Sequence, residues 1–237
     1  MRRLTRADLD WVLDLSAARR ERLVPFAPRF WNPAPAARDV HRDFLGSLID
    51  SPRVLSIRTD EGFLFGVSRD GILVVDDFAL EHETAWPLDG SALLRGASEE
   101  GRVRLVCPVP ESARRLAAAE IGLVTVESWW HRDLDPLGGP VEAGDDCRLV
   151  VEGAAGQLVP APPVYAPGGP VLLVTEVANA VALSAIEQAA VRRGAPVSVV
   201  TLPPDDPRGA QLLEPAGYRR TTDFLEQPVT RRPVGGR

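Results

Sequence analysis

The chain has 237 residues, 45% of them hydrophobic and 25% charged, and its 27 basic residues are all arginine. This composition is ordinary for a folded protein with one large domain or two small ones. The net charge of -6 disfavours non-specific nucleic-acid binding, which needs a basic surface. The absence of lysine excludes Schiff-base chemistry and a P-loop lysine.

The chain opens with a β-α-α-β-β-β-α-β-α-β order. Apolar periodicity predicts a strand at 2–4, a helix from Thr5 to about residue 23, and a helix at 36–49. It then predicts strands at 54–59, 62–68 and 72–80, a helix at 87–99, a strand at 103–107, a helix at 111–119 and a strand at 123–134. We interpret residues 1–135 as the first domain.

Residues 136–146 are rich in glycine, proline and acid, which predicts a linker. A second domain at 147–228 then follows. Its predicted strands are 147–152, 157–164, 171–177, 197–202 and 218–226, and its helices 179–193 and 206–214. The tail at 229–237 is expected to be mobile.

The two parts form a weak internal repeat. The strand GILVVDDFAL precedes a helix, Gly101, the strand VRLVC, a proline turn, a helix and Gly122. The strand GPVLLVTEVA precedes a helix, Gly194, the strand VSVVT, a proline turn, a helix and Gly217. The second copy lacks the two opening helices, so it is expected to be truncated.

Other features exclude further classes of protein. The two cysteines and three histidines are not spaced as zinc ligands, so we expect no metal site. No apolar run approaches the ~18 residues of a membrane-spanning helix, and acidic residues interrupt the N-terminus where a signal peptide would be apolar. We expect a cytoplasmic monomer or homodimer with no nucleic-acid or membrane partner.

The order of elements and the segment DDPRGAQLLEPAGYRR resemble the GCN5-related N-acetyltransferase (GNAT) superfamily. In the family's signature N-x-x-A-x-x-L-Y-x-x-x-G-F, Asp206 stands for the Asn, Ala210 for the Ala and Gly217–Tyr218 for Gly-Phe. The resemblance covers most of the chain as two linked copies. It implies an α/β fold: two GNAT-like mixed twisted sheets with helices on both faces.

The resemblance implies a CoA-dependent N-acetyltransferase that acts on a small-molecule amine. The acetyl-CoA pyrophosphate would lie at the N-terminus of the third helix, at Gly90 and Ser91, because free N–H groups and the helix dipole attract anions there. Backbone amides near Phe78, Ala79 and Leu80 would hold the thioester carbonyl. The second copy would be a structural lid.

The chain departs from the family in its cofactor residues. In one register of the pyrophosphate loop, Pro87 replaces the basic or amide residue, and in the next register Leu88 replaces the first glycine. Trp86 could fill the space of the pyrophosphate. Leu213 and Ala118 replace the tyrosine that serves as general acid. These departures favour an alternative: a non-catalytic GNAT-fold binding or scaffold protein that has lost acetyl-CoA.

Asp76 and Asp77 end an apolar strand, where the family can place the base that deprotonates the amine. Because neighbouring strand residues face opposite sides, only one of the two is expected to face the cleft. The alternative is a solvated strand end with one Asp capping a turn.

Three further residue types are candidates for the site. Arg29 and Trp31, in the loop between the first two helices, and Trp129 on the last strand could contact substrate, although aromatic residues there could equally pack in the core. His131 could act as acid or base, or be a hydrogen-bonded structural residue. Paired arginines on helices, such as Arg19–Arg20, are interpreted as solvated faces, although Arg114 could reach a CoA phosphate.

Overall fold

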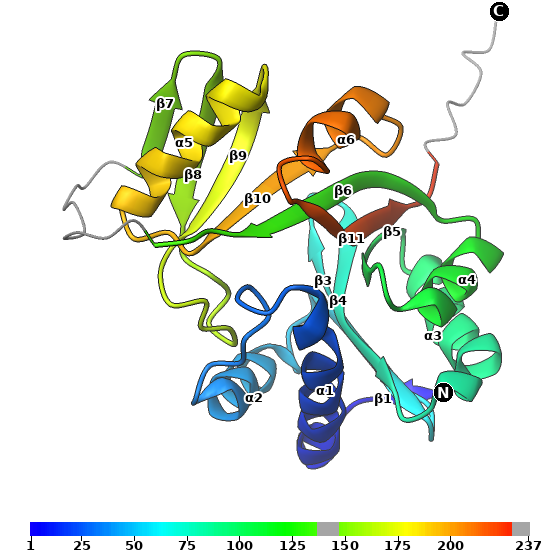
Figure 1. The fold of residues 1–237 in the computed structure, drawn as a ribbon. Coiled ribbons are helices and arrows are strands. Elements are labelled where there is room, and N and C mark those ends of the chain that lie inside the picture. The colour runs from blue at the N-terminus through cyan, green and yellow to red at the C-terminus, as the bar shows by residue number, and fades with distance from the viewer. Residues whose placement is uncertain (137–146, 229–237) are drawn as a thin grey trace, which may run out of the picture.

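The computed structural model describes residues 1–136 and 147–228 (Figure 1). The predicted linker, apart from residue 136, and the predicted mobile tail lie outside the described residues. The described helices are α1 (Leu9–Leu23), α2 (Ala37–Leu48), α3 (Ser91–Glu99), α4 (Ser112–Glu120), α5 (Ala180–Arg192) and α6 (Pro207–Leu213). The strands are β1 (Arg2–Arg3), β2 (Val54–Arg58), β3 (Gly62–Arg69), β4 (Ile72–Leu80), β5 (Arg102–Pro108), β6 (Val124–Asp133), β7 (Arg148–Val151), β8 (Ala154–Val159), β9 (Val171–Val177), β10 (Val197–Leu202) and β11 (Arg219–Glu226).

All of these strands belong to one mixed sheet, in the order β1-β2-β3-β4-β5-β11-β6-β10-β9-β8-β7. In Figure 1, α1 and α2 lie on one side of β3 and β4, and α3 and α4 lie on the other. Separate apolar clusters fill these two sides of the sheet. The expected α/β class with helices on both faces is therefore confirmed, and the strands of both parts join in a continuous sheet.

The last strands of the two parts lie beside one another at the centre of the sheet. β11 pairs with β5 on one side and β6 on the other, and β6 pairs in turn with β10. Each part therefore has the other part's final strand as a neighbour. Separating the two parts would break backbone hydrogen bonds along both strands.

β4 and β5 are parallel neighbours over only part of their length. Their registered pairs run from Ile72 with Arg102 to Val75 with Leu105. Beyond this point β4 continues beside β3, and β5 continues beside β11. A gap therefore opens between the carboxyl-terminal ends of β4 and β5.

The loop after α1 connects the two parts. Phe30 and Trp31 are buried in an apolar cluster with Val171, Val197 and Val199 of β9 and β10. The backbone of Ala34 donates a hydrogen bond of 3.0 Å to the carbonyl oxygen of Val164. This loop covers a face of the second part, whose described residues open with the strands β7 and β8 and not with helices. It also fixes the segment around Val164 beside α1 and α2.

Candidate functional site

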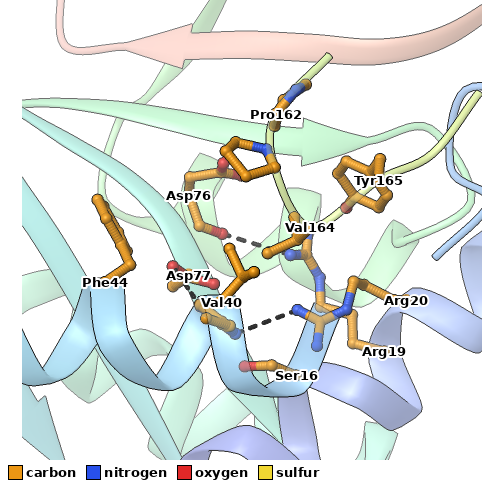
Figure 2. A pocket seen from close by; sticks show the side chains of 12 residues that line it. Ser16, Arg19, Arg20, Val40, Phe44, Asp76, Asp77, Pro162, Val164 and Tyr165 are labelled. Carbon is orange, nitrogen blue, oxygen red and sulfur yellow. Dashed lines mark hydrogen bonds and ion pairs between the residues drawn. The ribbon is translucent and has the colours of Figure 1, made fainter. Parts of the chain in front are cut away.

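A cavity of about 300 Å³ lies where the two parts of the chain meet (Figure 2). Helices α1 and α2, strand β4 and the segment between β8 and β9 supply its walls. The lining residues are Ser16, Arg19, Arg20, Val40, His41, Phe44, Asp76, Asp77, Pro162, Pro163, Val164 and Tyr165. The cavity therefore has an apolar wall formed by prolines, Val40, Val164 and Phe44, and a polar wall on α1 and β4.

Both Asp76 and Asp77 line this cavity, so the expectation that only one of them would face a cleft was wrong. The cause is a β-bulge. Phe65 of β3 pairs with Asp77 and Gly66 pairs with Val75, which leaves Asp76 without a partner in the register. An extra residue in one strand breaks the alternation of side chains and turns two successive residues toward one side.

The carboxylate of Asp77 is held by a buried histidine. His41 lies between Asp77 Oδ2, 3.1 Å from Nε2, and Arg20 Nη1, 3.2 Å from Nδ1. A guanidinium can only donate, so Nδ1 accepts and Nε2 donates its proton to Asp77. Burial alone would raise the pKa of Asp77, but this hydrogen bond and the nearby positive charges of Arg19 and Arg20 lower the pKa below its usual value.

The carboxylate of Asp76 has no hydrogen-bond or ion-pair partner among the described residues. Only its backbone oxygen is engaged, by Arg19 Nη1 at 3.3 Å. Asp76 is an exposed residue, and it lines the cavity. Desolvation and the neighbouring charge of Asp77 raise its pKa above the ordinary value of 3.8. Asp76 is therefore the acid of this site that remains available to a ligand.

Behind the cavity, Glu111 joins two buried arginines. It accepts from Arg19 Nε at 2.7 Å, and it lies 3.1 Å from Arg114 Nη1. Arg19, Arg20 and Arg114 are 8%, 6% and 0% exposed, so the interpretation of these residues as solvated faces was wrong. Burial, followed by the charge of Arg19, lowers the pKa of Arg114 to about 10.

Arg114 fills the gap between β4 and β5. Its Nη1 donates to the carbonyl oxygen of Val106 at 2.8 Å, and its Nη2 donates to that of Phe78. The guanidinium carbon lies 5.1 Å from the ring centre of Phe78 and 5.6 Å from that of Trp86. The strand carbonyls that a ligand in this gap would meet are thus already bonded to the chain's own side chain.

The residues expected to bind acetyl-CoA do not fit that cofactor. Phe78, Ala79, Leu80 and Ser91 are at most 5% exposed. At Gly90, an added Cβ would lie 2.5 Å from the ring of Trp86.

The N-terminus of the third helix is also displaced from its expected position. Helical structure starts at Glu83, ahead of the predicted start at residue 87, and passes through a π-helical turn, Trp86–Gly90, into α3. The N–H group of Ser91 is bonded to the carbonyl of Trp86. The amide of Ser91 is therefore not free for a pyrophosphate, and the ring of Trp86 occupies the space beside Gly90.

The second part offers no better cradle for a pyrophosphate. The segment leading into α5, residues 178–188, contains neither glycine nor arginine. Asn179 Oδ1 accepts a hydrogen bond of 2.9 Å from the N–H group of Ala182, which occupies one of the amides that an anion would use. Within the described residues, the positions expected to hold the acetyl-CoA pyrophosphate therefore do not fit it in either part.

The other predicted site residues lie away from the cavity. Arg29 donates to the backbone oxygens of Leu134 and Pro196, and Trp31 is 5% exposed in the core. The Nε1 group of Trp129 donates to Glu127 at 2.6 Å. The structure thus brings together Asp76 and Asp77 of the predicted set.

His131 is enclosed by aromatic rings and stacks on Phe30 at a ring distance of 4.4 Å. Its Nδ1 lies 2.5 Å from Thr221 Oγ1, and Nε2 is buried without a partner in the described chain. Burial lowers the pKa of His131 to about 3, so the ring is neutral at physiological pH. This position supports the structural alternative for His131.

Sequence reasoning missed the basic side of the cavity and the contribution of Tyr165. A signal was present in α1, where Ser16, Arg19 and Arg20 continue the buried stripe that begins with Leu9, Val12 and Leu13. Arginines on the apolar face of a helix indicate buried ion pairs or a site. No local signal could place Tyr165, which reaches the cavity from the second part.

One exposed grouping could hold a cation. Ligand atoms of Glu61, Glu81 and His82 lie within 4.8 Å of one another near the end of β4. Glu81 also accepts from Trp11 Nε1 at 2.7 Å. Exposed acidic groups of this kind are common, and we assign no metal to them.

No known protein-family model matches the chain, and no curated protein matches it. Solved structures do. A proposed acetyltransferase from Thermoplasma acidophilum matches with a TM-score of 0.57 and 12% identity, over 95% of this chain and 98% of that one. A GCN5-related N-acetyltransferase from Sphaerobacter thermophilus matches with a TM-score of 0.56 and 14% identity, over 95% and 93%.

The chain has the GNAT fold. At these identities, the likeness concerns the fold alone. In the described residues, no helix is both long and apolar enough to cross a membrane.

Proposed function

We propose that this GNAT-fold protein binds a small-molecule amine in the cavity and does not use acetyl-CoA. Of the two functions raised by the resemblance, N-acetyl transfer and non-catalytic binding, the geometry favours binding. The observation that carries the proposal is the contrast around β4: Arg114 occupies the gap between β4 and β5, whereas the carboxylate of Asp76 lacks a partner in the adjoining cavity.

An amine suits this cavity for two reasons. A protonated amine donates hydrogen bonds to a carboxylate, and such charge-assisted bonds are among the strongest between side chains and ligands. The apolar wall around Phe44 and Val164 would hold the hydrocarbon part of the ligand. Asp77 is less suited as the recognising acid, because His41 already occupies one of its oxygens.

We propose that residues 1–135 and 147–228 are two copies of one fold. The matching order of strands and helices around the parallel pairs β4–β5 and β9–β10 supports this division. Within this scheme the second copy acts as a lid, because its segment Pro162–Tyr165 forms one wall of the cavity.

Calorimetry with the purified chain tests the function. We expect saturable binding of small alkyl amines and none of acetyl-CoA at millimolar concentration. Asp76→Asn should weaken amine binding about tenfold or more, the size of one charge-assisted hydrogen bond. Asp43→Asn, on the exposed side of α2, is the matched control and should bind as the natural protein does. Saturable micromolar binding of acetyl-CoA would instead favour the acetyltransferase.

A further inference from the structure

Arg20 is a buried arginine that has no acidic partner among the residues the structure describes. It is 6% exposed, and its one hydrogen bond to a side chain of the described residues is the 3.2 Å contact from Nη1 to His41 Nδ1. Arg19, one residue earlier, has both Nε and Nη2 bonded to Glu111. An arginine so deeply buried ordinarily has a carboxylate, because an unpaired buried charge costs several kcal/mol.

The donors of Arg20 that have no hydrogen-bond partner in the described residues face the cavity. A guanidinium has five N–H donors, and one nitrogen is used. Some side-chain nitrogens and oxygens of the described residues are fully buried and lack a hydrogen bond, and no nitrogen of Arg20 is one of them. The remaining donors of Arg20 therefore have solvent-accessible surface. That surface lies on the cavity which the residue lines. In Figure 2 the Arg20 side chain extends from α1 toward the space that Asp76 and Asp77 approach from β4.

The cavity thus presents two groups of opposite charge that have no ion-pair partner among the described residues. Asp76 supplies an anion and Arg20 supplies a cation, whereas Arg19 shares Glu111 with Arg114. A ligand with only an amine would bind Asp76 and leave Arg20 without an ion-pair partner. A ligand with only a carboxylate would bind Arg20 and leave Asp76 without one.

We propose that the ligand is a zwitterion, an amino acid with an apolar side chain, whose ammonium group contacts Asp76 and whose carboxylate contacts Arg20. This inference rests on the proposed amine-binding function and names its ligand class. Arginine is suited to the task because its planar fork matches a carboxylate through two parallel hydrogen bonds. The cavity of about 300 Å³ is at the small end of ligand sites, and its apolar wall fits a hydrocarbon side chain.

Matched probes test the inference on the natural protein. Alanine, valine, leucine and phenylalanine are each titrated by calorimetry in three forms: the free amino acid, the amide and the N-acetyl derivative. The amide keeps the ammonium group and loses the carboxylate, and the N-acetyl form does the opposite. We expect at least one free amino acid to bind about tenfold or more tightly than both of its derivatives.

The outcomes distinguish a zwitterionic ligand from the proposed amine-binding function on which it rests. If the amides bind as tightly as the free amino acids, the zwitterion is overturned and amine binding stands. If neither the amino acids nor their amides nor plain alkyl amines bind, both proposals fail. Tightest binding by the N-acetyl forms would overturn the role of Asp76.

A variant assigns the carboxylate contact to its residue. Arg20→Gln removes the charge and keeps an amide that can donate to His41. We expect the free amino acid to lose about tenfold in affinity, whereas the affinity of its amide stays the same. An equal loss for both probes would indicate a merely structural role and overturn the assignment. Arg22→Gln, exposed on the same helix, is the control and should change neither affinity.

Discussion

Two regions adjoin the carboxyl-terminal half of β4, and they differ in whether their polar groups have hydrogen-bond partners within the described chain. In the gap toward β5, the carbonyl oxygens of Phe78 and Val106 are both bonded to Arg114. In the cavity toward α1 and α2, the carboxylate of Asp76 and most donors of Arg20 have no partner in the described chain. A filled polar space indicates structure, whereas an acidic and a basic group left open on the same cavity indicate a place for a ligand.

The largest expected effect on stability comes from removing the Arg114 guanidinium from the gap between β4 and β5. Arg114→Met removes the guanidinium donors from the carbonyl oxygens of Phe78 and Val106 and removes one partner of Glu111. Each unmet buried group costs ~1–3 kcal/mol, so the free energy of unfolding should fall by about 3 kcal/mol in chemical denaturation.

Arg95→Met, on an exposed position of α3, is the control and should change stability little. If Arg114→Met lowered the free energy of unfolding by less than about 1 kcal/mol, as an ordinary surface substitution does, Arg114 would not stabilise the gap between β4 and β5. A variant that instead gained acetyl-CoA binding would identify Arg114 as a removable plug.

The two neighbouring aspartates should differ in stability. Asp77→Asn loses a carboxylate whose pKa is lowered by His41 and nearby arginines, and should reduce the free energy of unfolding by about 1–2 kcal/mol at neutral pH. Asp76→Asn removes a carboxylate that has no partner within the described part of the chain, and it should not destabilise the fold. Denaturation of both variants at pH 7 measures the difference, and equal losses would contradict the assignment of Asp76 as the open group.

The same pair predicts opposite dependences of stability on pH. A lowered folded pKa adds stability that is present at neutral pH and lost as pH falls through that pKa, so Asp77→Asn should flatten the acid limb of the stability curve. A raised folded pKa, as for Asp76, opposes folding at neutral pH and ceases to do so in acid.

Binding should follow the titration of Asp76. Isopentylamine, which keeps its charge throughout, should lose affinity as pH falls through a value above 3.8, because protonation of the raised Asp76 carboxyl removes its charge. The charged and titratable groups that face Asp76 are Arg19, Arg20, His41, Asp77, Arg114 and Tyr165. Calorimetry from pH 4 to pH 7 measures the effect. A pH-independent affinity, or the same profile in Asp76→Asn, would assign recognition to another group.

Much of the fold could be predicted because its signals are local. The helix predicted at 36–49 is α2 (Ala37–Leu48), and the strand predicted at 72–80 is β4 with the same bounds. The strand predicted at 157–164 is instead β8 (Ala154–Val159), whose extent depends on pairing with β9 across the sheet. The adjacency of β11 and β6 also depends on such long-range pairing, which periodicity does not record.

The candidate site could be predicted only in part. Asp76 and Asp77 were found because acids at the end of an apolar strand are conspicuous. That both face the cavity follows from the bulge opposite Phe65 and Gly66, a property of how β3 and β4 pair. The basic side was missed because Arg20 was assigned to solvent by residue type, although its position continues the buried face of α1.

The smallest expected effect concerns His131, and it shows whether the region around it belongs to the site. His131→Phe keeps an aromatic ring against Phe30 and removes a buried nitrogen that has no partner, at the cost of the bond to Thr221. Amino-acid affinity should not change, and the free energy of unfolding at pH 7 should change by about 1 kcal/mol or less.

A pH comparison gives this last prediction its sharper form. The pKa of His131 is lowered to about 3 from an ordinary 6.5, so the unfolded chain binds a proton between these values and the folded chain does not. The natural protein should therefore lose stability from pH 7 to pH 5, and His131→Phe should lose less. His82→Phe, at an exposed position, is the control and should follow the natural protein. If His131→Phe weakened ligand binding while leaving this pH dependence intact, the histidine would belong with the cavity after all. The aromatic enclosure would then be part of the functional site.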